Sequence, residues 1–173
     1  GFGGAASMLV AAAELTSTRA VSRFEESARQ ASAAASLEPW TQFAIAIGLA
    51  CFIGSVTLTG SLVAFGKLQE LPQFKKPWDN PNRQWINLAL AVTALFLLWG
   101  VFGTSQLLFF LLLVLVAAAL GVTLTLPIGG ADMPVVICLL NSYSGLAAAA
   151  AGFVIDNSVL VIAGSLVGAS GLI

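Results

Sequence analysis

Charged residues are scarce in this chain. Asp, Glu, Lys and Arg make up only 9% of its 173 residues, whereas 58% are apolar and the mean hydropathy is +0.96. A typical soluble domain carries roughly 25% charged residues, and a soluble core could not bury this much apolar surface. The net charge of -1 and the lack of a basic tract also argue against nucleic-acid binding. The composition therefore predicts an integral membrane protein.

Histidine is absent, which removes the most common proton carrier near neutral pH and the most common metal ligand. The two cysteines, Cys51 and Cys138, lie in apolar runs, where we expect small buried thiols rather than a metal site or a disulfide framework. The sequence also contains no GxGxxG after a strand, no P-loop and no Ser/His/Asp set. We therefore expect neither a metal site nor a nucleotide site in this chain.

Long uncharged runs are present instead, at 39–66, 84–131 and 133–155. A spanning helix needs about 20 mainly apolar residues, so the run of 48 residues at 84–131 is expected to hold two helices separated by a turn in "FGTSQ". The sequence predicts a single all-α transmembrane domain over 1–173, a polytopic helix bundle with about five full spans plus a truncated N-terminal one. The expected helices are 1–14 (partial), 41–66, 83–102, 106–126, 134–153 and 157–173.

The first and last apolar segments, 1–14 and 157–173, are short for roughly 30 Å of hydrocarbon. We therefore expect the chain to be a piece of a longer protein. A signal peptide is not indicated at the start, because no basic region precedes the apolar run.

Positive charges gather between the first two long helices, in a proline-containing segment that we expect to be an irregular loop. The positive-inside rule places this loop on the cytoplasmic or matrix side. Alternation of the spans then places "PIGGAD" and the C-terminal end of the last helix on the same side. The loop 15–40, expected to be solvated and partly helical, faces the other side with the "GTSQ" turn and the Asp156 turn. The positive charges are Lys67, Lys75, Lys76 and Arg83.

Small residues recur at helical spacing on several of the expected helices. Such stripes let helix backbones approach closely. One stripe in the first long helix includes Gly48, Cys51, Ser55, Thr59 and Gly66, and one after Asp132 includes Cys138, Asn141, Gly145, Ala148 and Gly152. We expect helix packing at Gly145, Gly152, Gly164 and Gly168.

Polar residues inside the expected spans differ in what they need. Serines and threonines alternate in "GSVTLTGS", so they spread around a helix, and each can bond a backbone carbonyl of its own helix. Asn141 has amide donors and an acceptor that a helix backbone cannot satisfy. Packing against another helix and a hydrated pathway both remain open for it. Asp132 stands just before a helix, where a carboxylate can cap free N–H groups and meet the positive end of the dipole.

Two stretches, "IGGADMPVVICLLNSYSGLAAAAAGF" followed by "VGASG" and the earlier "IGSVTLTGSLVAFGKLQ", resemble the β-subunit portion of the membrane domain of proton-translocating NAD(P) transhydrogenases. Weaker similarity at "GFGGAASMLVAAAE" extends the resemblance to the start, whereas about 17–38 and 83–126 match only in hydropathy. The resemblance implies an enzyme that couples hydride transfer from NADH to NADP+ to proton translocation across the bacterial cytoplasmic or mitochondrial inner membrane. This chain alone would not be catalytic.

The resemblance also implies roles for single residues. It assigns Asn141 and Ser61 to the proton path and Asp132 to the inner mouth of that path, and we expect Ser144 in the same path. The "GGAD" turn would then link the membrane helices to a docked nucleotide domain. The family carries a membrane histidine just upstream of the segment that resembles "GFGGAA", and this chain has none.

The resemblance further implies that NADP(H) and NAD(H) bind to companion domains absent from this chain, which would hold no cofactor itself. The expected partners are the lipid bilayer, those NADP-binding and NAD-binding domains, other transhydrogenase membrane helices, and a second copy in a dimer of the complete enzyme. The alternative is a non-enzymatic helical scaffold or channel subunit in which the polar residues only mediate helix packing.

Overall fold

The computed structural model describes residues 1–17, 38–71, 81–104 and 107–173, and leaves out the side chains of 38–43, 102–104 and 107. All regular structure in these ranges is helical, which confirms the predicted all-α bundle. The expected character of the loops at 18–37 and 72–80 lies outside the described residues. The elements are α1 (Phe2–Thr16), α3 (Glu38–Leu68), α4 (Arg83–Thr104), α5 (Leu107–Thr125), the short 3-10 helix η1 (Gly130–Asp132), α6 (Met133–Val154) and α7 (Ser158–Ser170).

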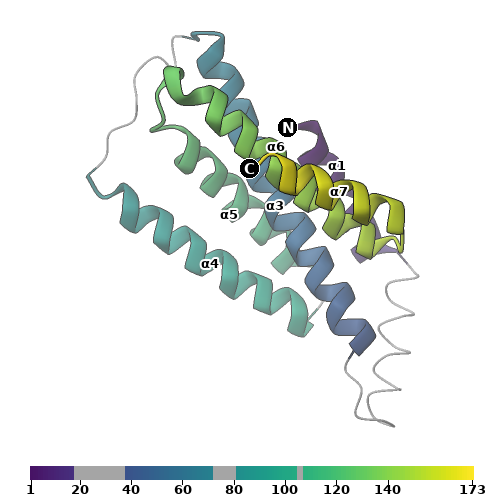
Figure 1. The fold of residues 1–173 in the computed structure, drawn as a ribbon. Coiled ribbons are helices and arrows are strands. Elements are labelled where there is room, and N and C mark those ends of the chain that lie inside the picture. The colour runs from purple at the N-terminus through teal and green to yellow at the C-terminus, as the bar shows by residue number, and fades with distance from the viewer. Residues whose placement is uncertain (18–37, 72–80, 105–106) are drawn as a thin grey trace.

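Helix α3 is the centre of the bundle. It packs against α1, α5 and α6, while α4 lies outside α5 and α7 lies against α6 (Figure 1). Small residues along α3 allow these approaches, because Gly54, Ser55 and Gly60 are all buried. The bundle therefore surrounds α3 with neighbours on several sides.

Four helices in the described part of the chain are long and apolar enough to cross a bilayer: Ala44–Leu68, Arg83–Val101, Leu108–Thr125 and Gly130–Val154. The sequence predicted a fifth full span at 157–173, but α7 has 13 residues, fewer than the roughly 20 that a crossing needs. It starts at Asn157, whose side chain accepts a hydrogen bond from the Leu160 N–H at 3.1 Å, and it ends before Gly171. By length, the described helices therefore include four full spans rather than five.

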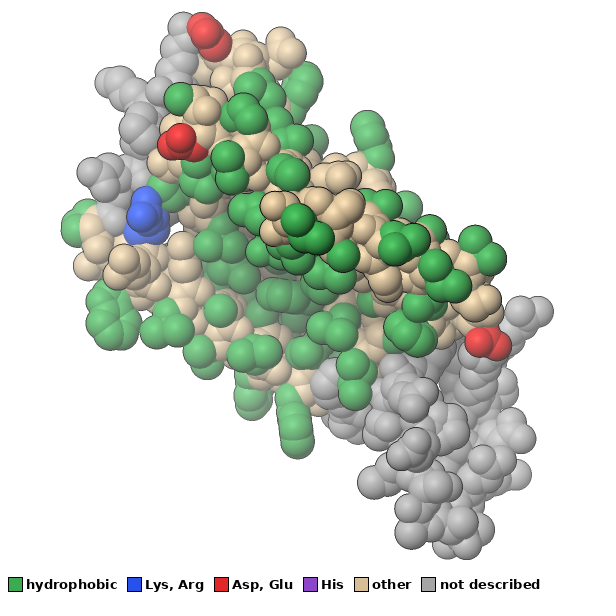
Figure 2. Space-filling model, viewed as in Figure 1, with side chains coloured by type: hydrophobic (Ala, Val, Ile, Leu, Met, Phe, Trp, Pro, Cys, Tyr) green, Lys and Arg blue, Asp and Glu red, His purple; other side chains and the backbone are tan. Residues whose placement is uncertain are grey.

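The outer surface of the bundle is apolar between its two ends. Figure 2 shows acidic and basic side chains together at one end of the molecule, acidic ones also at the other end, and mainly hydrophobic side chains between the two ends. Trp85, Phe96 and Trp99 of α4 are 70% or more exposed. Large aromatic side chains on an outer face at this density are expected to meet lipid rather than water. The chain is an integral membrane protein.

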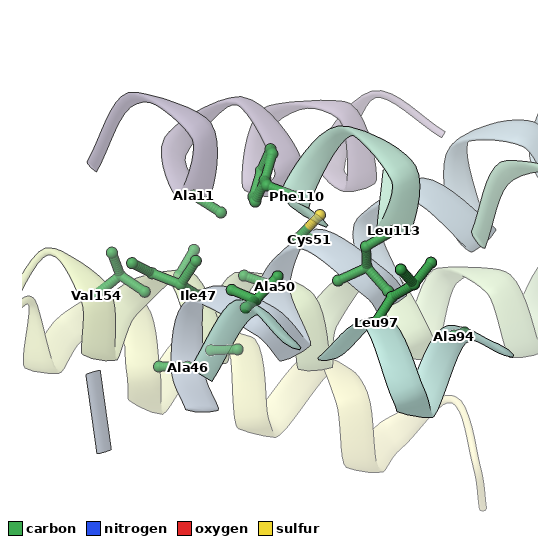
Figure 3. Close-up of a cluster of buried hydrophobic side chains, with 13 residues drawn as sticks. Ala11, Ala46, Ile47, Ala50, Cys51, Ala94, Leu97, Phe110, Leu113 and Val154 are labelled. Atoms are coloured by element: carbon green, nitrogen blue, oxygen red, sulfur yellow. The ribbon is translucent and has the colours of Figure 1, made fainter. Parts of the chain in front are cut away.

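The hydrophobic core occupies the half of the bundle remote from η1. It joins α1, α3, α4, α5 and α6 through small and branched side chains, including Ala11, Ala50, Cys51, Leu113 and Val154 (Figure 3). The polar residues that the sequence singled out lie in the other half, nearer to η1. The fold thus separates a closely packed hydrophobic half from a half that contains the candidate site.

Candidate functional site

The ends of the described helices gather at two ends of the bundle, as the alternation of helices predicts. At one end the Lys67 ammonium, in the last turn of α3, donates hydrogen bonds to the backbone oxygens of Leu126 and Ile128, just before η1. The turn at Asp156 lies at the opposite end, after α6. Helix α7 runs back from there, and a Cβ on Gly171 would lie 3.2 Å from the Cys138 carbonyl oxygen. The last helix therefore points toward the η1 end without reaching it.

Ser61 and Ser144 flank the first turn of α1. A Cβ placed on Gly1 would lie 3.0 Å from the Ser61 Cβ, and one placed on Gly3 would lie 3.6 Å from the Ser144 Cβ. Ser61 belongs to α3 and Ser144 to α6. Two residues predicted in the proton path, from helices far apart in the sequence, thus each lie beside the same turn of a third helix.

The Ser144 hydroxyl oxygen is buried and has no hydrogen-bond partner. Most serines in helices bond the carbonyl three or four residues back, as Ser142 does to the Cys138 oxygen at 3.1 Å. A buried hydroxyl left without a partner costs about 1–3 kcal/mol. The space beside Ser144 is therefore one where a water molecule or another polar group would be stabilised.

Asn141 lies one helical turn before Ser144 and is exposed on the outside of the bundle. Its amide makes no hydrogen bond to any residue in the described ranges. Of the two possibilities left open by the sequence, packing between these helices does not account for Asn141. The amide instead projects from the middle of a candidate span, Gly130–Val154, toward whatever lies beside the bundle.

Asp132 occupies the N-cap position of α6, but the prediction that it caps the helix is wrong. Its carboxylate accepts no hydrogen bond from the first turn. The preceding 3-10 turn fixes Asp132 at φ -91° and ψ 0°, away from the extended conformation that lets an N-cap side chain reach back to the N–H groups. The side chain is exposed, on a turn that lies nine residues from Asn141, about 14 Å along the helix. Asp132 therefore stands apart from the serine pair.

The four glycines assigned to packing all lie at the contact between α6 and α7. Gly145, Gly152, Gly164 and Gly168 are buried. A Cβ on Gly145 would lie 2.6 Å from the Gly168 nitrogen, and one on Gly152 would lie 2.8 Å from the Val161 nitrogen. The two backbones touch at these positions. Of the remaining members of the α6 stripe, Cys138 and Asn141 are exposed and Ala148 is half-buried, so the stripe is only partly covered.

One serine and one threonine of α3 donate hydrogen bonds only to carbonyl oxygens of their own helix, as the sequence allowed. Ser55 donates to the Cys51 oxygen at 2.7 Å, and Thr57 donates to the Gly54 oxygen at 3.0 Å. Thr59 differs, because its hydroxyl also lies 2.9 Å from the Ala118 oxygen of α5. Sequence reasoning missed this link, since Thr59 carries no signal that separates it from its neighbours.

Two other assignments are corrected by the structure. Lys67 was expected in the loop, yet it lies inside α3 and is only 9% exposed. Cys138 was expected to be buried, yet it is exposed, and its thiol lies 3.4 Å from the Gly171 oxygen. The sequence did indicate that Lys67 could belong to the helix, because this lysine directly follows the apolar run 39–66.

Comparison with known proteins gives one consistent result. A family described as NAD(P) transhydrogenase beta subunit matches the chain over residues 1–173. Two curated relatives from Rhodospirillum rubrum, one of them from a defined strain, are both named NAD(P) transhydrogenase subunit beta and are 44% identical over 129 residues. The match covers 75% of this chain and 27% of each relative. The chain thus spans about a quarter of the length of the relatives it matches.

Proposed function

Because this chain belongs to the NAD(P) transhydrogenase beta subunit family, we propose that it forms part of the membrane domain that couples hydride transfer from NADH to NADP+ to proton translocation. In this proposal the chain carries no hydride chemistry. NADP(H) and NAD(H) are held by companion domains. The membrane is the bacterial cytoplasmic or the mitochondrial inner membrane, and the complete enzyme is a dimer.

The observation that carries the proposal is the group formed by Ser61, Ser144 and the first turn of α1. The Ser144 oxygen is buried without a partner, and Ser61 approaches the same turn from α3. Polar groups within a membrane span are expensive unless they meet one another or water. A site that keeps an unpaired hydroxyl in such a place is suited to hold a water molecule that donates and accepts protons.

Asn141 extends this group toward the outside of the described helices. Its amide offers two donors and one acceptor, and it is exposed at the middle of a span. In our proposal it meets another transhydrogenase membrane helix, which supplies the titrating side chain, since this chain contains no histidine. Asn141 would orient that side chain and the water between it and Ser144.

Asp132 would act at the surface where a nucleotide-binding domain docks. The turn around it is exposed and Asp132 makes no capping bond, so its carboxylate is available to a partner. Coupling requires that a protonation change and a change in nucleotide binding bias the same two-state element. In our proposal the η1 turn, between helix α6 and the surface where a nucleotide-binding domain docks, is that element.

The test uses the complete enzyme reconstituted in proteoliposomes. Proton uptake is followed with a trapped pH-sensitive dye while hydride transfer is followed by nucleotide absorbance. Asn141→Ala and Ser144→Ala are each expected to lower the protons moved per hydride transferred or to slow coupled turnover. Ser165→Ala is the matched control, because Ser165 is exposed on α7 and bonds only the Val161 oxygen of its own helix.

The outcome that contradicts the proposal is normal proton movement in both the Asn141 and Ser144 variants. That result would favour the scaffold alternative, in which these side chains serve only the assembly of helices. The match to the transhydrogenase beta subunit family argues against that alternative.

A further inference from the structure

The hydrogen bonds of Lys67 suggest a role that the sequence did not. We propose that Lys67 is a positioning residue, which ties the end of α3 to the η1 turn and so fixes where Asp132 stands. This inference rests on the proposed function, because it concerns how the membrane site communicates with the docking surface.

The contact joins two segments that are about 60 residues apart in the sequence. The Lys67 ammonium donates to the backbone oxygens of Leu126 and Ile128. Leu126 follows the last residue of α5, and Ile128 immediately precedes Gly129 at the start of the η1 turn. One side chain of α3 therefore holds both the end of α5 and the beginning of the turn.

The chemistry of this contact explains why a buried lysine is tolerated. The last carbonyls of a helix have no partner within it, and they form the negative end of the helix dipole. An ammonium group there makes charge-assisted hydrogen bonds, which are stronger than neutral ones. Pro127 stands between the two acceptors and has no N–H, so it cannot donate the hydrogen bond that would continue the α5 helix. Lys67 of α3 thus donates hydrogen bonds to backbone oxygens just after α5, which the α5 helix itself does not satisfy.

Backbone hydrogen bonds shape the turn beyond this contact, including one from the Asp132 N–H to the Gly129 oxygen at 3.2 Å, but side chains hold it only at its two ends. Ile128 is fixed by Lys67, and Met133, at the start of α6, is completely buried. The residues between them are exposed, and a Cβ on either Gly129 or Gly130 would meet nothing within 4 Å. Since no side-chain packing holds the middle of the turn, these two anchors determine where the hydrogen-bonded turn, and with it Asp132, lies against the bundle.

The same helix that supplies the anchor also lines the candidate site. Ser61 and Lys67 are six residues apart on α3, a separation of about 9 Å along a continuous helix. A shift or rotation of α3 at the level of Ser61 would therefore move the Lys67 ammonium and, through it, the Ile128 oxygen. Lys67 would carry a change at the polar site to the turn with Asp132, without contacting a proton or a nucleotide.

The experiment places a spin label on the turn of the complete enzyme. The exposed residue Ala131 is replaced by cysteine in a background without other reactive thiols, including Cys138→Ser, and labelled. The label mobility and the coupled turnover are compared for the parent, Lys67→Met, Lys67→Arg and Arg83→Met. Arg83 is the matched control, since it begins α4 at the same end of the bundle and also carries one positive charge.

Lys67→Met is expected to mobilise the label and to lower coupled turnover about fivefold or more, at the lower end of the range for coupling between two sites. Lys67→Arg keeps charged donors and is expected to restore both in part, and Arg83→Met is expected to change neither. An unchanged label spectrum and normal turnover in Lys67→Met would overturn the inference. So would an equal effect of Arg83→Met, which would indicate only a loss of surface charge.

The two proposals fail in different ways. If the Asn141 and Ser144 variants pump normally, the proposed function fails, while the spin label still reports whether Lys67 holds the turn. If the label is mobilised by Lys67→Met but coupled turnover is normal, Lys67 does not act in coupling and the inference is overturned on its functional side.

Discussion

Gly4 of α1 and Gly54 of α3 face each other at a reciprocal backbone contact. A Cβ on Gly4 would lie 2.7 Å from the Gly54 oxygen, and a Cβ on Gly54 would lie 2.6 Å from the Gly4 oxygen. Neither helix can approach so closely with any side chain at these positions. This crossing fixes the position of α1 along α3 and so places its first turn beside Ser61 and Ser144.

Gly54→Ala tests this crossing. The added methyl group must push α1 away from α3, and overpacking of this kind costs about 1–3 kcal/mol. We expect a lower midpoint of thermal unfolding for the complete enzyme in detergent, together with slower proton-coupled turnover. Gly129→Ala is the control for the unfolding midpoint alone, because Gly129 has open space around it and a φ of -67°, which alanine adopts without strain.

The contact between α6 and α7 gives a second prediction. A Cβ on Gly164 would lie 2.7 Å from the Gly145 oxygen, so Gly164→Val should separate the two helices and lower the unfolding midpoint. Ala163→Val, at the exposed neighbouring position, should leave that midpoint near the parent value. Equal midpoints for both variants would show that the α6–α7 backbone contact does not stabilise the bundle.

The hydroxyl of Thr59 gives a third prediction, because it reaches from α3 to the Ala118 oxygen of α5. Thr59→Val keeps the shape of the side chain and removes the hydrogen bond. Interhelical hydrogen bonds of this type contribute on average about 0.6 kcal/mol in membranes, so a small but measurable loss of unfolding free energy is expected. Thr93→Val should show no comparable loss, since Thr93 is exposed and bonds only the Ala89 oxygen of its own helix.

The helix positions were largely predictable from sequence, since long apolar runs bounded by charges and turn residues mark spans directly. The predicted span 134–153 and the observed helix Met133–Val154 differ by one residue at each end. The last helix was overestimated, because its apolar character continues through Gly171 to Ile173 beyond the helical residues. Apolar runs therefore predicted the positions of the helices better than their lengths.

The orientation of each helix about its own axis was much less predictable. In a membrane both the lipid-facing and the protein-facing sides are apolar, so hydrophobic periodicity does not distinguish them. Cys138 was therefore expected inside and lies outside. The grouping of Ser61 with Ser144 around α1 depends on that orientation as well, and hydrophobic periodicity did not predict it.

Asp132 gives the last prediction, which separates a role in stability from a role in coupling. Asp132→Asn should leave the unfolding midpoint of the complete enzyme unchanged, because the carboxylate makes no capping hydrogen bond to α6. It should slow or uncouple proton-linked turnover, because the exposed turn would lose the charge that a docked nucleotide domain meets. Both quantities can be measured on the same purified variant. A lower midpoint with normal coupling would reverse the assignment: Asp132 would then stabilise the start of α6, and the docking surface would have to lie elsewhere.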